Sequence, residues 1–312
     1  MMPTRHGSLR LFRLFGIEVF LHWSWFLVAL YEVTQRGSEY DSLIWNLIEY
    51  VALFGIVTMH EFGHALACRQ TGGRADQIIL WPLGGVAYVA PPQRAGAMLW
   101  SIVAGPLVNL ILLPFLFAAL WVAVLLGWES SVPNLYLFVR SICWINTGLL
   151  IFNLLPVYPL DGGQILRSLL WFPLGRGRSL LVASLIGLPF VAGLLVFLVW
   201  KTSDPIAWLM CLFILANCWR GFREARILQV LERIPRRHGY QCPACGQAPI
   251  LGPAWQCSRC GERFDLFARE GACPACGSVY PVGQCLDCGC VKPFAAWDTP
   301  AKPPPILPRT EP

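Results

Sequence analysis

The sequence predicts an all-α polytopic membrane protein with about six transmembrane helices, a short membrane-associated β-hairpin and a small C-terminal zinc-ribbon domain. Three observations lead to this prediction. Apolar residues make up 56% of the 312 residues and charged residues only 13%, and the mean hydropathy is +0.54, as is typical of a membrane protein. The apolar residues fall into long runs that are separated by short polar segments. Nine of the 13 cysteines, in contrast, lie within residues 242–290.

The apolar runs and the charges between them predict the topology. Each run is long enough, or nearly long enough, to cross a bilayer, and we expect spans at 17–34, 43–68, 97–127, 136–156, 180–200 and 205–219. Arginines gather before the first span and after the second, fourth and sixth, whereas the opposite loops carry acidic residues. The positive-inside rule therefore places both termini in the cytoplasm. This juxtamembrane excess also accounts for the net charge of +6, so the charge does not require nucleic acid as a partner.

The segment 78–89, between the second and third spans, is apolar but too short to cross a membrane. Two runs of β-forming residues flank Leu83-Gly84-Gly85, which is typical of a hairpin. The sequence predicts a hairpin at the membrane, either dipping into it or held at its surface by Trp81.

The second span contains the motif His60-Glu61-Phe62-Gly63-His64. On a helix, His60 and His64 project from one face and can share a zinc ion, while Glu61 lies close enough to accept a proton from water. A carboxylate at membrane depth costs about 2.5–3.5 kcal/mol, which favours a functional role. The alternative interpretation is two hydrogen-bonded histidines on a buried helix.

Catalytic zinc usually has three protein ligands and one open position. Asp161 can complete the set, because it directly follows the fourth apolar run, where two prolines break the helix. Alternatively, Asp161 is the N-cap of a helix over 162–171. Beside two histidines with zinc-ligand spacing, we favour the ligand.

These motifs resemble those of a known family. His60-Glu61-Phe62-Gly63-His64-Ala65 and the run Asn153…Pro156…Pro159-Leu160-Asp161-Gly162-Gly163 resemble the two signature motifs of the site-2 protease family of intramembrane zinc metalloproteases. The segment Ala104-Gly105-Pro106-Leu107-Val108-Asn109 is similar to the family's Gly-Pro-x-x-Asn element. The resemblance covers about residues 1–225. It is to the compact six-span prokaryotic branch that lacks a PDZ domain.

The resemblance implies a zinc-dependent endopeptidase that cleaves a transmembrane or membrane-proximal segment of a membrane-protein substrate in a prokaryotic plasma membrane. It implies that the hairpin pairs with the unwound substrate, which suits the need to open a helix before a peptide bond can be attacked. The implied ligands of one catalytic zinc ion are His60, His64 and Asp161. Glu61 would be the general base.

Two asparagines of these motifs have less certain roles. The resemblance implies that Asn153 contacts the substrate carbonyl, although the residue equally suits a contact between helices. Asn109 is expected to be structural and to satisfy backbone groups beside Gly105-Pro106.

The cysteine-rich tail is expected to bind structural zinc. Each Cys-x-x-Cys-Gly sequence forms a turn that presents two thiolates, so four turns supply two four-cysteine sites. Sequential pairing is the simpler arrangement and interleaving the alternative; sequential pairing gives the sites Cys242, Cys245, Cys257 and Cys260, then Cys273, Cys276, Cys285 and Cys288. Disulfides conflict with the expected cytoplasmic location, and an iron–sulfur cluster is a second alternative. Cys290 is left over, as a substitute ligand or a free thiol.

We therefore expect a transmembrane metalloprotease domain at 1–225, a basic linker at 226–240, a double zinc ribbon at 241–291 and a disordered Pro-rich tail at 292–312. The ribbon is not notably basic, which argues against nucleic acid. We expect it to recruit substrate or to regulate access, through a cytoplasmic protein partner. The alternative function is a non-proteolytic membrane adaptor that presents the ribbons to a partner; the presence of Glu61 beside a full ligand set argues against it.

Overall fold

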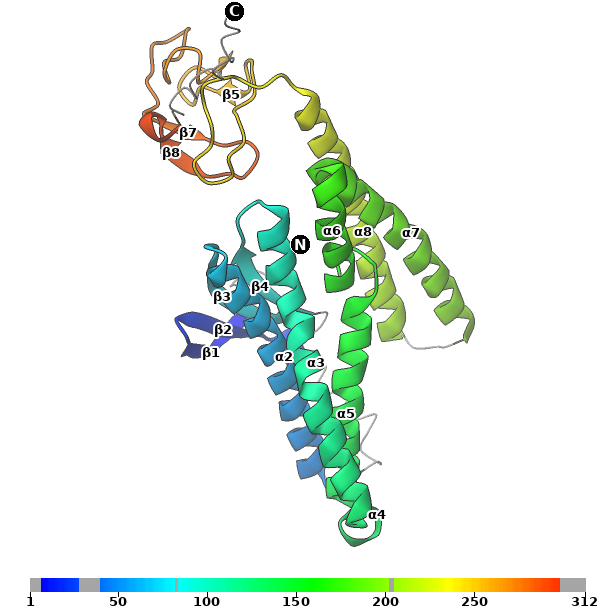
Figure 1. Ribbon diagram of the computed structural model, residues 1–312. Helices are drawn as coiled ribbons and strands as arrows, with labels where there is room; N and C mark the ends of the chain where they lie inside the picture. The colour runs from blue at the N-terminus through cyan, green and yellow to red at the C-terminus, as the bar shows by residue number, and fades with distance from the viewer. Residues whose placement is uncertain (1–6, 28–39, 82–83, 202–204, 298–312) are drawn as a thin grey trace, which may run out of the picture. The chain divides into compact units, whose positions relative to one another are not determined.

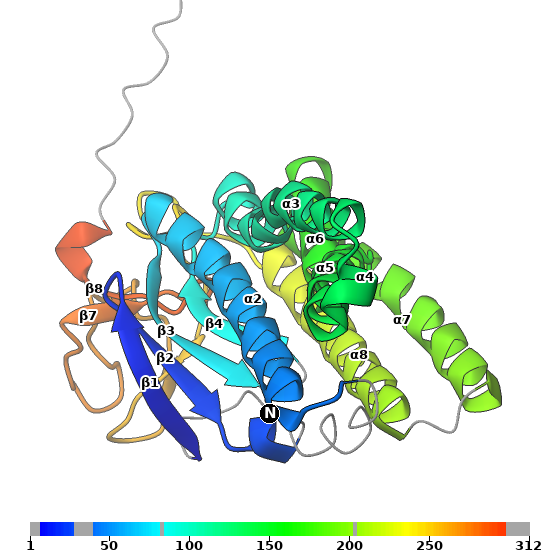
Figure 2. The ribbon, with the colours of Figure 1, turned by 90° about the horizontal axis from the view of Figure 1, so that it is seen from below.

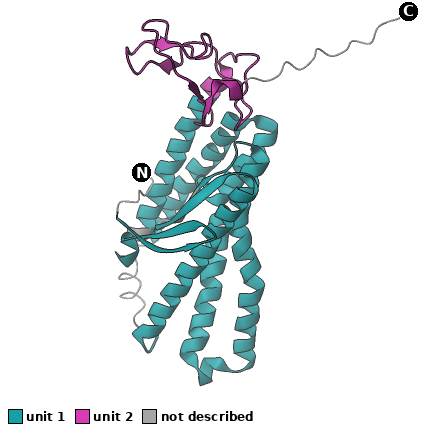
Figure 3. Ribbon diagram, turned by 90° about the vertical axis from the view of Figure 1, so that its left-hand side faces the viewer, with its two compact units in different colours: residues 1–228 teal, residues 229–312 magenta. Residues whose placement is uncertain are grey.

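The computed structural model describes residues 7–27, 40–81, 84–201 and 205–297. The chain divides into two compact units, residues 1–228 and 229–312, which Figure 3 shows in different colours.

The first unit is built mainly from helices (Figure 1). Within the described ranges, four helices are long and apolar enough to cross a membrane: α2 (Leu43–Gln70), α3 (Ala95–Leu125), α5 (Pro133–Leu154) and α7 (Arg176–Lys201). They correspond to the second to fifth predicted spans. The remaining helices are α4 (Trp128–Ser131), α6 (Asp161–Leu174) and α8 (Pro205–Arg233).

The first and sixth predicted spans differ from the structure, so six spans are not confirmed. The first run begins as strand β2 (Ile17–His22), and its residues 28–34 lie outside the described residues. Hydropathy does not distinguish a buried strand from the start of a helix. The sixth run is the first part of α8, which continues as a polar helix to Arg233. The expected linker therefore begins inside a helix.

Four strands form one sheet in the order β1 (Ser8–Leu14), β2, β3 (Arg74–Trp81) and β4 (Gly84–Ala90). β3 and β4 are the predicted hairpin, with residues 82–83 of its turn outside the description. The sequence did not predict that β1 and β2 would extend this hairpin. β2 runs parallel to β3, and Val19 pairs with Ile78 in the register.

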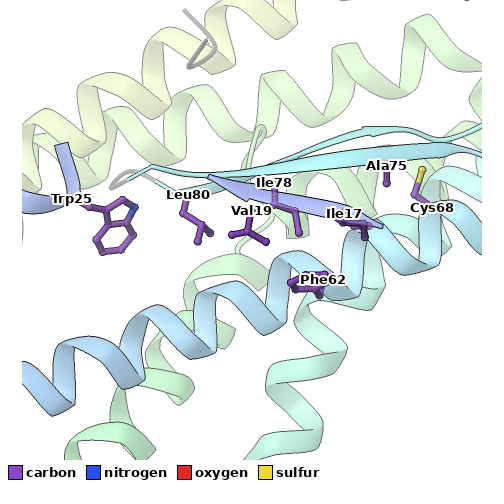
Figure 4. Close-up of a cluster of buried hydrophobic side chains, with 9 residues drawn as sticks. Ile17, Val19, Trp25, Phe62, Cys68, Ala75, Ile78 and Leu80 are labelled. Atoms are coloured by element: carbon purple, nitrogen blue, oxygen red, sulfur yellow. The ribbon is translucent and has the colours of Figure 1, made fainter. Parts of the chain in front are cut away.

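The sheet packs against α2, the helix that carries the histidine motif (Figure 2). Ile17, Val19, Ile78 and Leu80 are fully buried in this layer and form one cluster with Phe62 of α2 (Figure 4). Burying large aliphatic side chains contributes about 1.5–3 kcal/mol each. Because Phe62 directly follows Glu61, the sheet stabilises the motif's own turn of helix.

The second unit has short paired strands and a core made largely of cysteines. The strands are β5 (Trp255–Gln256), β6 (Arg263–Phe264), β7 (Val282–Gln284) and β8 (Val291–Pro293). We expected the ribbon to end at residue 291, but the structure extends it. Trp297 is fully buried and its carbonyl accepts a hydrogen bond from the Gln241 amide at 2.8 Å. Burial of the Trp297 side chain makes residues 292–297, which we expected to belong to the tail, part of the folded second unit. Residues 298–312 lie outside the described residues.

Candidate metal centres

The structure brings His60, His64 and Asp161 together in the interior of the first unit. The two Nε2 atoms lie 3.0 Å apart, and Asp161 Oδ2 lies 3.0 Å from His60 Nε2 and 3.3 Å from His64 Nε2. Both histidines are buried, with 5% and 8% of their surface exposed. Three potential ligand atoms therefore converge on one point from α2 and from the start of α6.

The loop before α6 carries Asp161 to this point. The helix N-cap is Leu160, whose side chain makes no capping hydrogen bond, so Asp161 is the first helical residue and the N-cap interpretation is wrong. Two glycines let the loop fold back on the helix. A Cβ atom on Gly162 would lie 2.3 Å from the Leu154 carbonyl oxygen, and one on Gly163 would lie 2.3 Å from the Tyr158 nitrogen. Both distances are too short for any side chain.

Helix α3 supports the two histidines from behind. A Cβ atom on Gly105 would lie 2.2 Å from His64 Nε2, so the glycine provides the space that the imidazole occupies. The Ser101 carbonyl oxygen accepts a hydrogen bond from His64 Nδ1 at 2.9 Å, and Asn109 Oδ1 lies 2.7 Å from His60 Nδ1. Asn109 was expected to serve the backbone near Gly105; the structure instead places it on a histidine, as the residue one helical turn further along the same face.

A zinc ion fits the three converging atoms. With zinc–nitrogen bonds of 2.0–2.1 Å, two ligands of a tetrahedral ion lie about 3.3 Å apart, close to the distances given above. Asp161 Oδ2 is buried and accepts no hydrogen bond from the residues that the structure describes. A buried carboxylate oxygen that faces two imidazole nitrogens needs a cation or a proton to offset its desolvation. The donor set of two imidazoles and one carboxylate is one that catalytic zinc uses.

The two other predicted site residues, Glu61 and Asn153, differ in how deeply they are buried. Glu61 is buried, 5% exposed, and its charge acts on His64. Asn153 is half-buried in the last turn of α5. Its side chain makes no hydrogen bond within the described part of the chain. Sequence reasoning missed Asn146 of α5, which is fully buried against Asn109; as a single polar residue in an apolar run, it gave no motif to find.

The second unit groups its cysteines in a nested order, which corrects the sequential pairing. One group combines the first and last turns, as Cys242, Cys245, Cys285 and Cys288. The other combines the second and third, as Cys257, Cys260, Cys273 and Cys276. Spacing alone did not decide between the pairings, because all four turns have the same sequence pattern.

Both groups have the dimensions of a four-thiolate zinc site. Zinc–sulfur bonds of 2.3 Å place the sulfurs of a tetrahedral site about 3.8 Å apart. Sγ atoms from different turns lie 3.6 and 3.7 Å apart in the outer group and 3.6 and 3.7 Å apart in the inner group. The Tyr280 hydroxyl donates to Cys257 Sγ at 3.2 Å and lowers the pKa of this thiol to about 6, which favours the thiolate that zinc binds.

Cys290 lies beside the outer group without being one of its four members. Its Sγ is 3.2 Å from Cys242 Sγ, and its carbonyl oxygen accepts the Cys285 amide at 2.8 Å. Gln247, Glu262 and Ser278 make the same backbone bond in the other three turns. The backbone of Cys290 therefore closes the fourth turn, and this hydrogen bond does not depend on its thiol.

The basic segment expected as a linker is attached to the second unit. Arg236 Nη1 lies 2.6 Å from Asp287 Oδ2 and Arg237 Nη2 lies 2.5 Å from Asp265 Oδ2. The hydrogen bond to Asp287 raises the pKa of Arg236. Asp287 lies within the fourth cysteine turn and Asp265 lies between the second and third turns, so these ion pairs hold residues 236–237 against the cysteine-rich part of the second unit.

Comparison with known proteins finds relatives of the first unit. Residues 48–132 and 128–196 match the model of peptidase family M50. A zinc metalloprotease of Methanocaldococcus jannaschii is 31% identical over 190 residues, which are 61% of this chain and 53% of the relative. Stage IV sporulation protein FB of Bacillus subtilis is 28% identical over 196 residues, which are 61% of this chain and 64% of the relative. The chain thus spans between about half and two thirds of the length of these relatives.

A solved structure shows the same fold. The site-2 protease of Methanocaldococcus jannaschii superimposes with a TM-score of 0.50 at 28% sequence identity. The match covers 69% of this chain and 95% of the other chain.

Proposed function

Because residues 48–196 match the model of peptidase family M50, we propose that this chain is a member of that family and a zinc-dependent intramembrane endopeptidase. The chain is an integral membrane protein with apolar helices around a polar centre. We propose that its substrate is a membrane protein that is cut within or beside a transmembrane segment. Such a cut releases part of the substrate from the membrane.

The observation that carries this proposal is the convergence of His60, His64 and Asp161 with Glu61 buried beside them. A zinc ion held there would polarise a peptide carbonyl and acidify a water molecule. Glu61 then accepts the proton of the attacking water and delivers it to the leaving amine. A protein that served only as a membrane adaptor would not need this carboxylate, so the adaptor function is not favoured.

We propose that Asn153 acts on the substrate rather than on the metal. Its amide hydrogen-bonds none of the described residues and is half-buried near the end of α5, so it is available to donate to a carbonyl oxygen. We propose that β4, an edge strand of the sheet, makes a second contact with the substrate. An extended peptide can add to such an edge by main-chain hydrogen bonds, and this would hold a substrate segment out of its helical form.

The proposed location follows from the arginines. Arg69 lies in the last turn of α2 and Arg74 follows the helix, and Arg176 and Arg178 precede the apolar part of α7. By the positive-inside rule, these ends face the cytoplasm, which supports cytoplasmic termini in a prokaryotic plasma membrane. His64 lies five residues before Arg69 in α2, and Asp161 Oδ2 lies 3.3 Å from His64 Nε2, so we propose that water enters the site from the cytoplasm.

Cells that express the wild-type chain should release a protein fragment that is absent from cells expressing Asp161→Asn. The substitution removes a charged ligand and is expected to empty the centre of zinc. Comparison of the membrane and soluble proteomes of the two strains measures the effect. Asp76→Asn is the matched control, because the Asp76 side chain is 82% exposed. Identical fragments from wild type and Asp161→Asn would contradict the proposal and favour the adaptor.

We further propose that the chain consists of a protease domain over 1–225 followed by a double zinc ribbon that recruits substrates. The ribbon exposes Val279, Val291 and Leu251, apolar side chains suited to a protein partner rather than to nucleic acid. Deleting residues 241–312 should reduce cleavage in cells while the zinc content of the centre and the abundance of the protein stay unchanged. Cleavage at the wild-type rate would show that the ribbon does not recruit substrate.

A further inference from the structure

Two asparagines form a hydrogen-bonded pair directly behind His60. Asn109 of α3 and Asn146 of α5 are each fully buried. Asn109 Nδ2 donates to Asn146 Oδ1 at 2.9 Å, and Asn146 Nδ2 donates to the main-chain oxygen of Asn109 at 3.0 Å. Asn109 Oδ1 lies 2.7 Å from His60 Nδ1. The chain of hydrogen bonds thus runs from α5 through α3 to the imidazole on α2.

The main-chain oxygen of Asn109 determines which atom donates and which atom accepts in every hydrogen bond of this series. A main-chain carbonyl oxygen only accepts hydrogen bonds, so the atom of Asn146 that faces it must be the amide nitrogen. The oxygen of Asn146 must then face Asn109, which turns the nitrogen of Asn109 towards it. Asn109 consequently presents its oxygen to His60, and His60 Nδ1 must carry the hydrogen. This assignment leaves the lone pair of the neutral imidazole on Nε2, the atom that faces Asp161.

The two histidines of the centre differ in the group that accepts the hydrogen bond from Nδ1 and so determines the tautomer. His64 Nδ1 faces the main-chain oxygen of Ser101, which cannot change from acceptor to donor. His60 faces a side-chain amide, whose oxygen and nitrogen exchange places on a half turn. If Asn109 were turned, its nitrogen would donate to His60 Nδ1. The hydrogen of His60 would then lie on Nε2, where it would block coordination.

We propose that Asn109 and Asn146 are positioning residues that hold His60 in the tautomer able to bind the metal. Asn109 makes the contact, and Asn146 prevents Asn109 from turning. The inference rests on the proposed zinc centre and extends it to a residue on α5 that has no contact with the metal ligands. Second neighbours of this kind typically change metal affinity by about 10–100-fold.

The test measures metal binding to the full chain and does not depend on cleavage. Cobalt(II) replaces zinc in the purified protein, and the visible absorption that Asp161→Asn removes defines binding at this centre, apart from the cysteine sites. Asn146→Leu and Asn109→Leu should each weaken binding at the centre by about 10–100-fold. Asn109→Asp should bind more tightly than Asn109→Leu, because a carboxylate still accepts from His60 Nδ1 although it no longer donates to Asn146 Oδ1.

Thr147→Val is the matched control. Thr147 neighbours Asn146 on α5, and its hydroxyl bonds only within its own helix, to the Cys143 carbonyl at 2.7 Å. It should bind cobalt like wild type. Wild-type affinity in both leucine variants, or equal losses in Asn109→Asp and Asn109→Leu, would overturn the proposal. If the leucine variants do not fold, Asn109→Asp decides: complete loss of the absorption of the centre would refute a role for an acceptor at this position.

The same experiment separates this inference from the proposed function. A wild-type protein that binds cobalt at the centre but cleaves nothing would refute the protease and leave the positioning role intact. A wild-type protein with no absorption assignable to the centre would refute both.

Discussion

Replacing Glu61 by Gln is expected to abolish proteolysis while zinc stays bound. The three atoms that converge on the metal position come from His60, His64 and Asp161, so the substitution leaves the ligand set complete. An amide has nearly the volume of a carboxylate but cannot accept the proton of the attacking water. Loss of a general base lowers the rate by about 10²–10⁴-fold.

The measurement pairs cleavage of a fragment-releasing substrate in proteoliposomes with the zinc content of the same sample. Glu49→Gln is a suitable control, because Glu49 lies on the same helix, is equally buried and accepts a hydrogen bond from Tyr40, which an amide oxygen can also do. Cleavage by Glu61→Gln at a rate near that of wild type would contradict the assigned base. Loss of zinc from Glu61→Gln would show instead that this residue holds the metal.

Removing zinc is expected to unfold the second unit and to leave the helices of the first unit intact. Half of the eight buried core residues in the second unit are cysteines of the two groups; the others are Phe264, Leu266, Phe267 and Trp297. The strands are two or three residues long. So small a core supplies little stability of its own, whereas structural zinc contributes an apparent 10–16 kcal/mol in small zinc-binding peptides.

Limited trypsin digestion of the full chain with and without a zinc chelator measures this effect. Without metal, cleavage should appear after Arg259, which lies within the second cysteine turn, and after Arg263 and Arg269, which lie between the second and third turns. Cys257→Ser should show the same cleavage without chelator, while Cys211→Ser, a buried cysteine outside both groups, should resist. A metal-free tail as resistant as the loaded one would show that its fold does not depend on zinc.

The sequence predicted the centre better than it predicted the surrounding fold. The ligand positions follow from local patterns: two histidines one helical turn apart, and an aspartate where prolines and glycines end a span. The role of Asn109 on His60 and the presence of Asn146 depend on how α2, α3 and α5 pack. Such contacts join residues 37 positions or more apart in the chain and leave no periodic signal.

The missed strands have a similar cause. Residues 17–22 are apolar enough to begin a membrane helix, and only their parallel pairing with β3, more than fifty residues later, decides for a strand. Likewise, four cysteine turns with the same sequence pattern allow several pairings, and only the three-dimensional structure distinguishes the nested pairing from the others. The sequence identified the elements in these regions but not their partners.

The nested cysteine pairing has a consequence for the order in which the tail assembles during synthesis. The inner group closes between Cys257 and Cys276, whereas the outer group needs Cys288 to complete the turn that starts at Cys242. Shorter loops close at a smaller entropic cost and more quickly. Zinc in the inner group would therefore be acquired first, and Cys242 and Cys245, the first thiols of the tail to be synthesised, would wait longest for a complete site. In this interval they are the part of the nascent chain most exposed to oxidation or to the wrong metal.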